Sequence, residues 1–154
     1  MLSSSDVLDA LGETFDESIL TDKYLMDLRD FLFSLPPGAV YALISILPKI
    51  QNQRLEKAIL AVVAIKACYI REDITPNISS LKNSLILELI NIIRNSRLPV
   101  PGLLMLGLTR NESPSVRKEA TQLLLDSNPD NLKYLFHLID DTNLTINSLI
   151  CSYM

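Results

Sequence analysis

The amino-acid sequence predicts an all-α protein, and more specifically a right-handed α-solenoid of about four helical hairpins. Three observations lead to this prediction. Apolar residues recur with helical spacing along most of the chain, strand signals are nearly absent, and one apolar pattern repeats about every 30 residues. The chain has 154 residues, of which 48% are hydrophobic and 21% charged, so it can fold and bury a core.

Prolines separate the periodic segments and indicate where helices begin. Proline is favoured at the first position of a helix, because its missing N–H group would be unpaired there in any case. Ser113 and Asn128 each precede a proline and are expected N-caps. We expect helices over residues 22–34, 37–47, 53–70, 83–95, 101–110, 114–126, 129–140 and 144–153. A short helix is expected near residues 5–12, and a loop with one helical turn over residues 71–82.

Four of the expected helices carry the same apolar pattern at a nearly constant spacing. Their first apolar positions are Leu55, Ile86, Val116 and Ile146, which are 31, 30 and 30 residues apart. Any amphipathic helix has one apolar stripe, but a constant spacing across successive helices is typical of a helical solenoid. Positions 0, +4 and +7 from each start are all apolar or aromatic: Leu55, Ile59, Val62, Ile86, Ile90, Ile93, Val116, Ala120, Leu123, Ile146, Ile150 and Tyr153.

The helices that precede three of these four also begin alike. Pro37-Gly38 and Pro101-Gly102 open two of them, and Pro129-Asp130 opens another. Each unit is therefore expected to be a hairpin of a first and a second helix. One hairpin cannot bury both of its apolar faces, so stacking along one axis closes the core between neighbours.

The segment from Asn111 to Ala120 resembles the start of the second helix of a HEAT repeat. In that motif a polar residue is followed by proline, valine, arginine and alanine at fixed positions, which Pro114, Val116, Arg117 and Ala120 match. By pattern the resemblance extends over about residues 37–154. The motif arginine is replaced in the other units, at positions 56, 87 and 147, so the chain is similar to the broader HEAT-like, armadillo-type class of the bacterial short-repeat kind.

The two ends of the chain differ. Residues 1–21 are rich in acidic and hydroxyl side chains and are expected to form a lead-in or cap. Residues 22–154 are expected to form the repeat domain. The apolar end from Leu149 to Met154 lacks a helix-ending glycine or proline. We therefore expect either that the chain is a fragment of a longer repeat protein, or that its last face packs on further repeats or on another chain.

Composition excludes several classes of function. The formal net charge is −4 and basic residues are scattered, which argues against nucleic-acid binding. No apolar run is long enough to cross a bilayer, so membrane insertion is not expected. Cys68 and Cys151 are far apart and show no metal-ligand spacing, which favours buried free thiols in a reducing, cytoplasmic compartment. No metal and no cofactor are expected.

Catalysis is not expected either. His137 lies four residues before Asp141, as a general base with an orienting carboxylate would, but this spacing is equally typical of a solvent-facing histidine on a helix. Asp140 and Asp141 are expected to cap a turn rather than to bind a cation. Phosphate-binding loops and known nucleophile motifs are absent from the sequence.

Partner binding is the function that remains, as a non-catalytic scaffold or adaptor that docks a protein or peptide on the second helices of the hairpins. The alternating charges on the expected outer face favour such a ligand over a polyanion. Two alternatives rest on resemblance: a bilin-lyase-like subunit acting on a phycobiliprotein, and an armadillo-like component of a motor or transporter complex. The expected partner-binding residues are Lys57, Glu88, Asn91, Lys118 and Thr121.

Overall fold

The computed structural model describes residues 20–154, and within this range the protein is all-helical, with no strand. The longer helices are α2 (Asp22–Ser34), α4 (Gln53–Ala67), α6 (Asn83–Asn95), α8 (Pro114–Ser127) and α9 (Leu144–Tyr153). Between them lie α3 (Ala39–Ile46), α5 (Thr75–Ser79) and α7 (Gly102–Leu108). The remaining elements are the 3₁₀-helices η1 (Leu47–Lys49), η2 (Pro129–Tyr134) and η3 (Phe136–Leu138).

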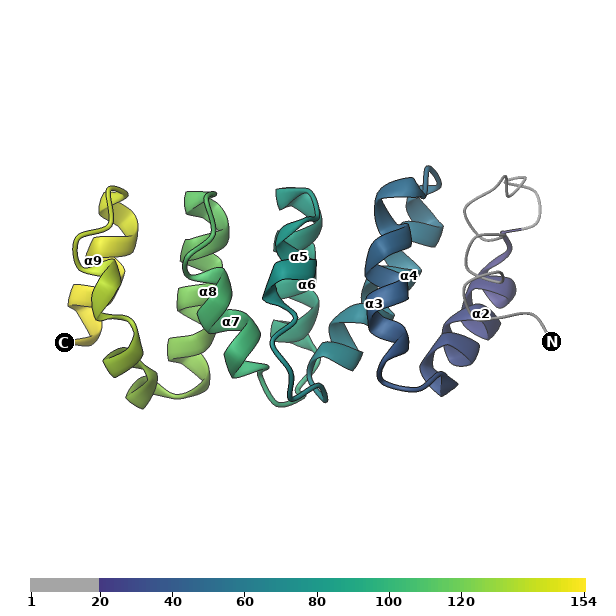
Figure 1. Ribbon diagram of the computed structural model, residues 1–154, viewed down its shortest axis with the longest axis horizontal. Coiled ribbons are helices and arrows are strands. Elements are labelled where there is room, and N and C mark those ends of the chain that lie inside the picture. Colours follow the sequence, from purple (N-terminus) through teal and green to yellow (C-terminus); the bar gives the residue numbers. More distant parts are fainter. Residues whose placement is uncertain (1–19) are drawn as a thin grey trace.

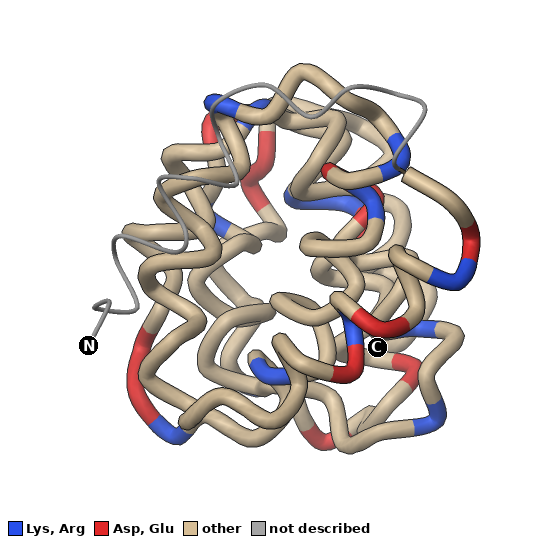
Figure 2. Tube along the Cα trace, turned by 90° about the vertical axis from the view of Figure 1, so that its right-hand side faces the viewer, with Lys and Arg blue, Asp and Glu red and all other residues tan. Residues whose placement is uncertain are grey.

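The helices follow one another along the long axis in the order of the sequence, from α2 at one end to α9 at the other (Figure 1). α2 packs on α4, α4 on α6, α6 on α8 and α8 on α9. We call these five helices the long-helix row. α3 contacts α5 and α5 contacts α7, which forms a second layer that packs against the first. In the view along the axis, acidic and basic residues are interspersed along the trace (Figure 2).

Polar side chains cap the N-terminal ends of several helices. The Asn52 side-chain oxygen accepts hydrogen bonds from the backbone N–H groups of Arg54 and Leu55, at 3.0 and 3.1 Å. Asn143 does the same for Thr145 at the start of α9. These contacts satisfy backbone donors that have no partner within the first turn of a helix. Asn128 caps η2 as expected, whereas Ser113 occupies the N-cap position of α8 without a side-chain hydrogen bond.

The repeated apolar positions form the core. Every position in the 0, +4, +7 pattern is buried except Tyr153, which is half-buried. They belong to one cluster that runs from Leu28 to Ile150 through all the longer helices. Burying a side chain of this size contributes about 1.5–3 kcal/mol, so the stripe on each long helix is a main source of stability.

A buried lysine ties α2 to α4. The Lys66 side chain is only 8% exposed, and its ammonium donates to the carbonyl oxygens of Phe33 at 3.2 Å and Leu35 at 2.6 Å. These carbonyls lie at the C-terminal end of α2, where helix carbonyls lack intrahelical partners and a positive charge is favourable. Burial lowers the pKa of this lysine.

One predicted element is wrong. Residues 129–140 do not form an α-helix but two 3₁₀-helices, η2 and η3, that meet at Leu135. Leu135 and Leu138 are buried and Leu132 is half-buried, so the apolar residues that face the core are spaced by three. A 3₁₀-helix has three residues per turn, so it places residues that are three apart on the same side.

The other predicted elements occur with shifted ends. The helices expected at 37–47, 53–70 and 101–110 are shorter, because they begin after Pro37 and Pro101 and the second ends at Ala67. The single turn expected within 71–82 is α5, which is confirmed. The helix expected near 5–12, and the lead-in at 1–21 apart from its last two residues, lie outside the described residues.

Candidate functional site

Three charged residues predicted to bind a partner lie on successive members of the long-helix row. Lys57 on α4 and Lys118 on α8 are exposed, and Glu88 on α6 is half-exposed. All three occupy the same place in the repeat, two residues after its first apolar position. None makes a hydrogen bond or ion pair with another residue in the described part of the chain, so their charges remain available.

Asn91 is exposed on α6, one turn after Glu88. Its side-chain oxygen and its backbone carbonyl both accept hydrogen bonds from the Asn95 amide, at 3.2 and 2.9 Å. The Asn91 amide nitrogen is not used in these bonds. The site therefore presents a hydrogen-bond donor beside the Glu88 carboxylate.

Thr121 does not belong to this surface, and the prediction that placed it there is wrong. Its side chain is fully buried in α8, with 0% exposure. The hydroxyl oxygen finds no hydrogen-bond partner. α8 packs against α6, α7 and α9, and Thr121 is covered there although Asn91, at the same repeat position on α6, is exposed.

Polar contacts join neighbouring members of the long-helix row near the predicted residues. Arg94 on α6 pairs with Glu119 on α8 at 2.7 Å. Asp126 on α8 accepts from the Tyr153 hydroxyl of α9 at 3.0 Å and from Gln122 at 2.7 Å. These contacts are largely exposed, so they add little to the apolar packing that positions the helices with the unpaired charges.

Arg117 connects α8 to the segment that follows η3. Arg117 Nε and a second guanidinium nitrogen donate to the two carboxylate oxygens of Asp141, at 2.8 and 2.9 Å. Asp141 also accepts from the backbone N–H of Asn143. The Arg117 hydrogen bond holds the pKa of the Asp141 carboxyl below its ordinary value, with the Asn143 N–H adding to the effect. Asp141 is thus a structural partner and the cap of a turn.

His137 is exposed, and its Nε2 lies 3.4 Å from the Thr109 hydroxyl oxygen. The Asp141 carboxylate, which could have oriented it, is occupied by Arg117. Among residues 20–154 no three His, Cys, Asp or Glu side chains gather as metal ligands would. Both cysteines are free thiols, but Cys68 is only half-buried and Cys151 is exposed, so the expectation that both are buried is wrong.

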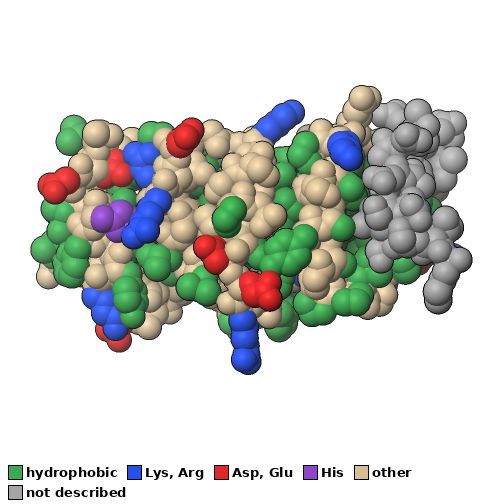
Figure 3. Space-filling model, in the orientation of Figure 1, with side chains coloured by type: hydrophobic (Ala, Val, Ile, Leu, Met, Phe, Trp, Pro, Cys, Tyr) green, Lys and Arg blue, Asp and Glu red, His purple; other side chains and the backbone are tan. Residues whose placement is uncertain are grey.

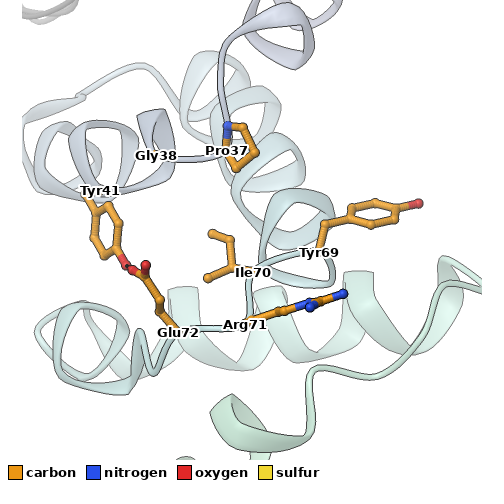
Figure 4. Close-up of a pocket in the computed structure, with 7 residues that line it drawn as sticks. All are labelled: Pro37, Gly38, Tyr41, Tyr69, Ile70, Arg71 and Glu72. Carbon is orange, nitrogen blue, oxygen red and sulfur yellow. Dashed lines mark hydrogen bonds between the residues drawn. The ribbon is translucent and has the colours of Figure 1, made fainter.

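A surface depression of about 200 Å³ lies away from these residues, where the start of α3 meets the loop between α4 and α5. Figure 4 shows Ile70 near its middle, with Pro37 above it. Tyr69 and Arg71 extend to one side of Ile70, and Tyr41 and Glu72 lie on the other. Sequence analysis did not identify this site, because the start of α3 and the loop after α4 are distant in the sequence and become neighbours only when α3 packs against α4.

Two side chains in the depression already form a hydrogen bond with each other. The Tyr41 hydroxyl donates to Glu72 at 2.6 Å, and this hydrogen bond raises the pKa of the tyrosine. Arg71 and Tyr69 are exposed and have no polar partner among the described residues. On the face that Figure 3 presents, hydrophobic side chains are mixed with scattered charges of both signs.

Comparisons with other proteins leave the family open. No known protein family, curated protein or solved structure matches this chain. None of the helices in residues 20–154 combines the length and apolar character needed to cross a bilayer.

Proposed function

We propose that the chain is a right-handed, HEAT-like α-solenoid that acts as a non-catalytic scaffold or adaptor in the cytoplasm. Its partner is a protein or peptide that docks along the long-helix row. The observation that carries the proposal is the set of unpaired charges on successive helices, Lys57, Glu88 and Lys118, at one position of a repeated pattern. A regular row of this kind offers a partner contacts at each repeat.

The charges alternate in sign along the row, from basic to acidic to basic. A partner with acidic groups opposite Lys57 and Lys118 and a basic group opposite Glu88 would gain attraction at every step. A partner bound in the wrong register would place like charges opposite one another and would lose this attraction. Exposed charges of this kind contribute mainly to specificity and to the rate of association, while contact area with the helices supplies affinity.

A site-specific crosslinking experiment tests the proposal. A photo-crosslinking amino acid replaces Asn91 on α6, and a matched control replaces Leu103, which is 57% exposed on α7 in the other layer. We expect a discrete crosslinked partner from position 91 and not from position 103. The crosslink is expected to disappear in the double variant Glu88→Lys/Lys118→Glu. Equal crosslinking from both positions, or crosslinking that survives the charge reversals, contradicts the proposed surface.

A further inference from the structure

The depression beside α3 has two chemically different sides. Its middle is apolar, with Pro37 and Ile70, and the aromatic ring of Tyr41 lies to one side. On the side of Tyr69 and Arg71, the guanidinium donors and the tyrosine hydroxyl have no partner among the described residues. On the opposite side the Glu72 carboxylate is an acceptor, and the Tyr41 hydroxyl already occupies one of its oxygens.

Arg71 is the cation that lacks a counter-charge here. Its neighbour in sequence, Glu72, turns away from it toward Tyr41 (Figure 4). A free guanidinium presents a fork of N–H donors that matches the two oxygens of a carboxylate. Tyr69, whose side chain lies on the same side and is 62% exposed, adds a ring face and a hydroxyl.

We propose that this depression is a second interaction site, which binds an extended peptide segment of a partner protein. The segment carries a proline or aliphatic residue that covers Pro37 and Ile70, followed by an acidic residue that pairs with Arg71. The position of Glu72 sets the direction of the peptide, because an acidic residue at the opposite end would meet like charge. This site is separate from the long-helix row and does not depend on the function proposed for it.

The dimensions and charges favour this class of ligand over others. About 200 Å³ accommodates one or two side chains, not a large cofactor. Extended, proline-containing peptides bind shallow aromatic-lined grooves well, since their backbone is already close to its bound conformation. A polyanion such as nucleic acid would meet the Glu72 carboxylate and would find only one arginine among the residues that line the depression.

The test uses two capped synthetic peptides, Gly-Pro-Leu-Glu-Gly and Gly-Pro-Leu-Gln-Gly, titrated into the 154-residue chain and followed by the amide NMR signals of residues 69–72. We expect the acidic peptide to shift these signals and to bind about tenfold more tightly than the glutamine peptide. Arg71→Gln is expected to remove this difference by weakening only the acidic peptide. Tyr69→Ala is expected to weaken both.

Lys49→Gln is the matched control, since Lys49 is an exposed cation in η1, at the other end of α3 from the depression, and belongs to neither proposed site. This variant is expected to leave both peptides unaffected. Equal affinity for the two peptides, a response to Lys49→Gln equal to that of Arg71→Gln, or no shift at millimolar peptide would each overturn the inference. The crosslinking experiment at Asn91 addresses the long-helix row alone, so failure of one site is distinguished from failure of the other.

Discussion

The close approach of α5 and α7 makes Gly107 the most informative single position in the fold. A Cβ atom at Gly107 would lie 2.1 Å from the Thr75 hydroxyl oxygen, 2.6 Å from its methyl carbon and 2.8 Å from its Cβ. Rotation of the threonine side chain can relieve only one of the first two contacts, because two of the three positions on its Cβ always carry a heavy atom, and it leaves the third contact unchanged. Gly107→Ala therefore forces α5 and α7 apart, since ordinary contacts between such atoms need 3.4 Å or more.

The size of the effect follows from two opposing contributions. Overpacking of this kind costs about 1–3 kcal/mol, and three contacts under 3.0 Å place Gly107→Ala near the upper end. The higher helix propensity of alanine, compared with glycine, stabilises the folded state by about 1 kcal/mol. We expect a net loss of about 2 kcal/mol in the free energy of unfolding, which corresponds to a fall of about 4–8 °C in Tm for a chain of this size.

Urea unfolding followed by circular dichroism measures this loss, and α7 supplies its own control. Gly102 opens the same helix, and a Cβ there would have no atom within 4 Å, so Gly102→Ala is expected to change stability little. Thr75→Ala removes two of the three offending atoms, so the double variant Thr75→Ala/Gly107→Ala should lose less than the sum of the single variants. A Gly107→Ala protein as stable as the parent would refute the described contact between α5 and α7.

Three further predictions follow from individual residues. Thr121→Val removes a buried hydroxyl that has no partner and is expected to raise the free energy of unfolding by about 1 kcal/mol in urea titrations; a loss would show that the hydroxyl is bonded. Asp141→Asn is expected to cost about 2 kcal/mol at pH 7, because the half-buried Arg117 loses its counter-charge. Since the Asp141 pKa is lowered in the folded state, its contribution is present above about pH 3.9 and is lost as the pH falls through the folded-state pKa. The stability curves of parent and variant should therefore converge in acid, and a constant gap would contradict this role. Arg97 adopts φ of 58° just after α6, where glycine is favoured, so Arg97→Gly should be about 0.5–1 kcal/mol more stable than Arg97→Ala in thermal unfolding, and equal values would argue against a left-handed residue.

The sequence contains enough information to predict the long helices and their buried faces. The repeated apolar stripe is local, since each helix shows it without reference to its neighbours, and its positions are buried from Leu55 to Ile150. Residues 129–140 were predicted less well, because Leu132, Leu135 and Leu138 fit a three-residue period while Leu135 and Ile139 also fit an α-helical one. Packing against α8 and α9 decides between the two periods, and a single sequence does not show that packing.

The exposure of the predicted partner-binding residues could be inferred only in part, for a related reason. Lys57, Glu88 and Lys118 carry charges that are too costly to bury alone, so their exposure follows from residue type. Thr121 has no such constraint, because a threonine is tolerated on either side of a helix and only its neighbours determine which. The depression near Ile70 forms where the start of α3 meets the loop after α4, and residue spacing alone does not show that contact.

Distances between spin labels along the long-helix row test most directly whether the hairpins are stacked in a line. Labelled cysteines replace Lys57, Lys118 and Ser148 in a background in which Cys68 and Cys151 are serine. Packed helices lie about 8–10 Å apart, so a linear stack predicts a distance between positions 57 and 148 about 10 Å longer than that between positions 57 and 118. A distance between 57 and 148 equal to or shorter than that between 57 and 118 would indicate a closed bundle and contradict the stacked arrangement.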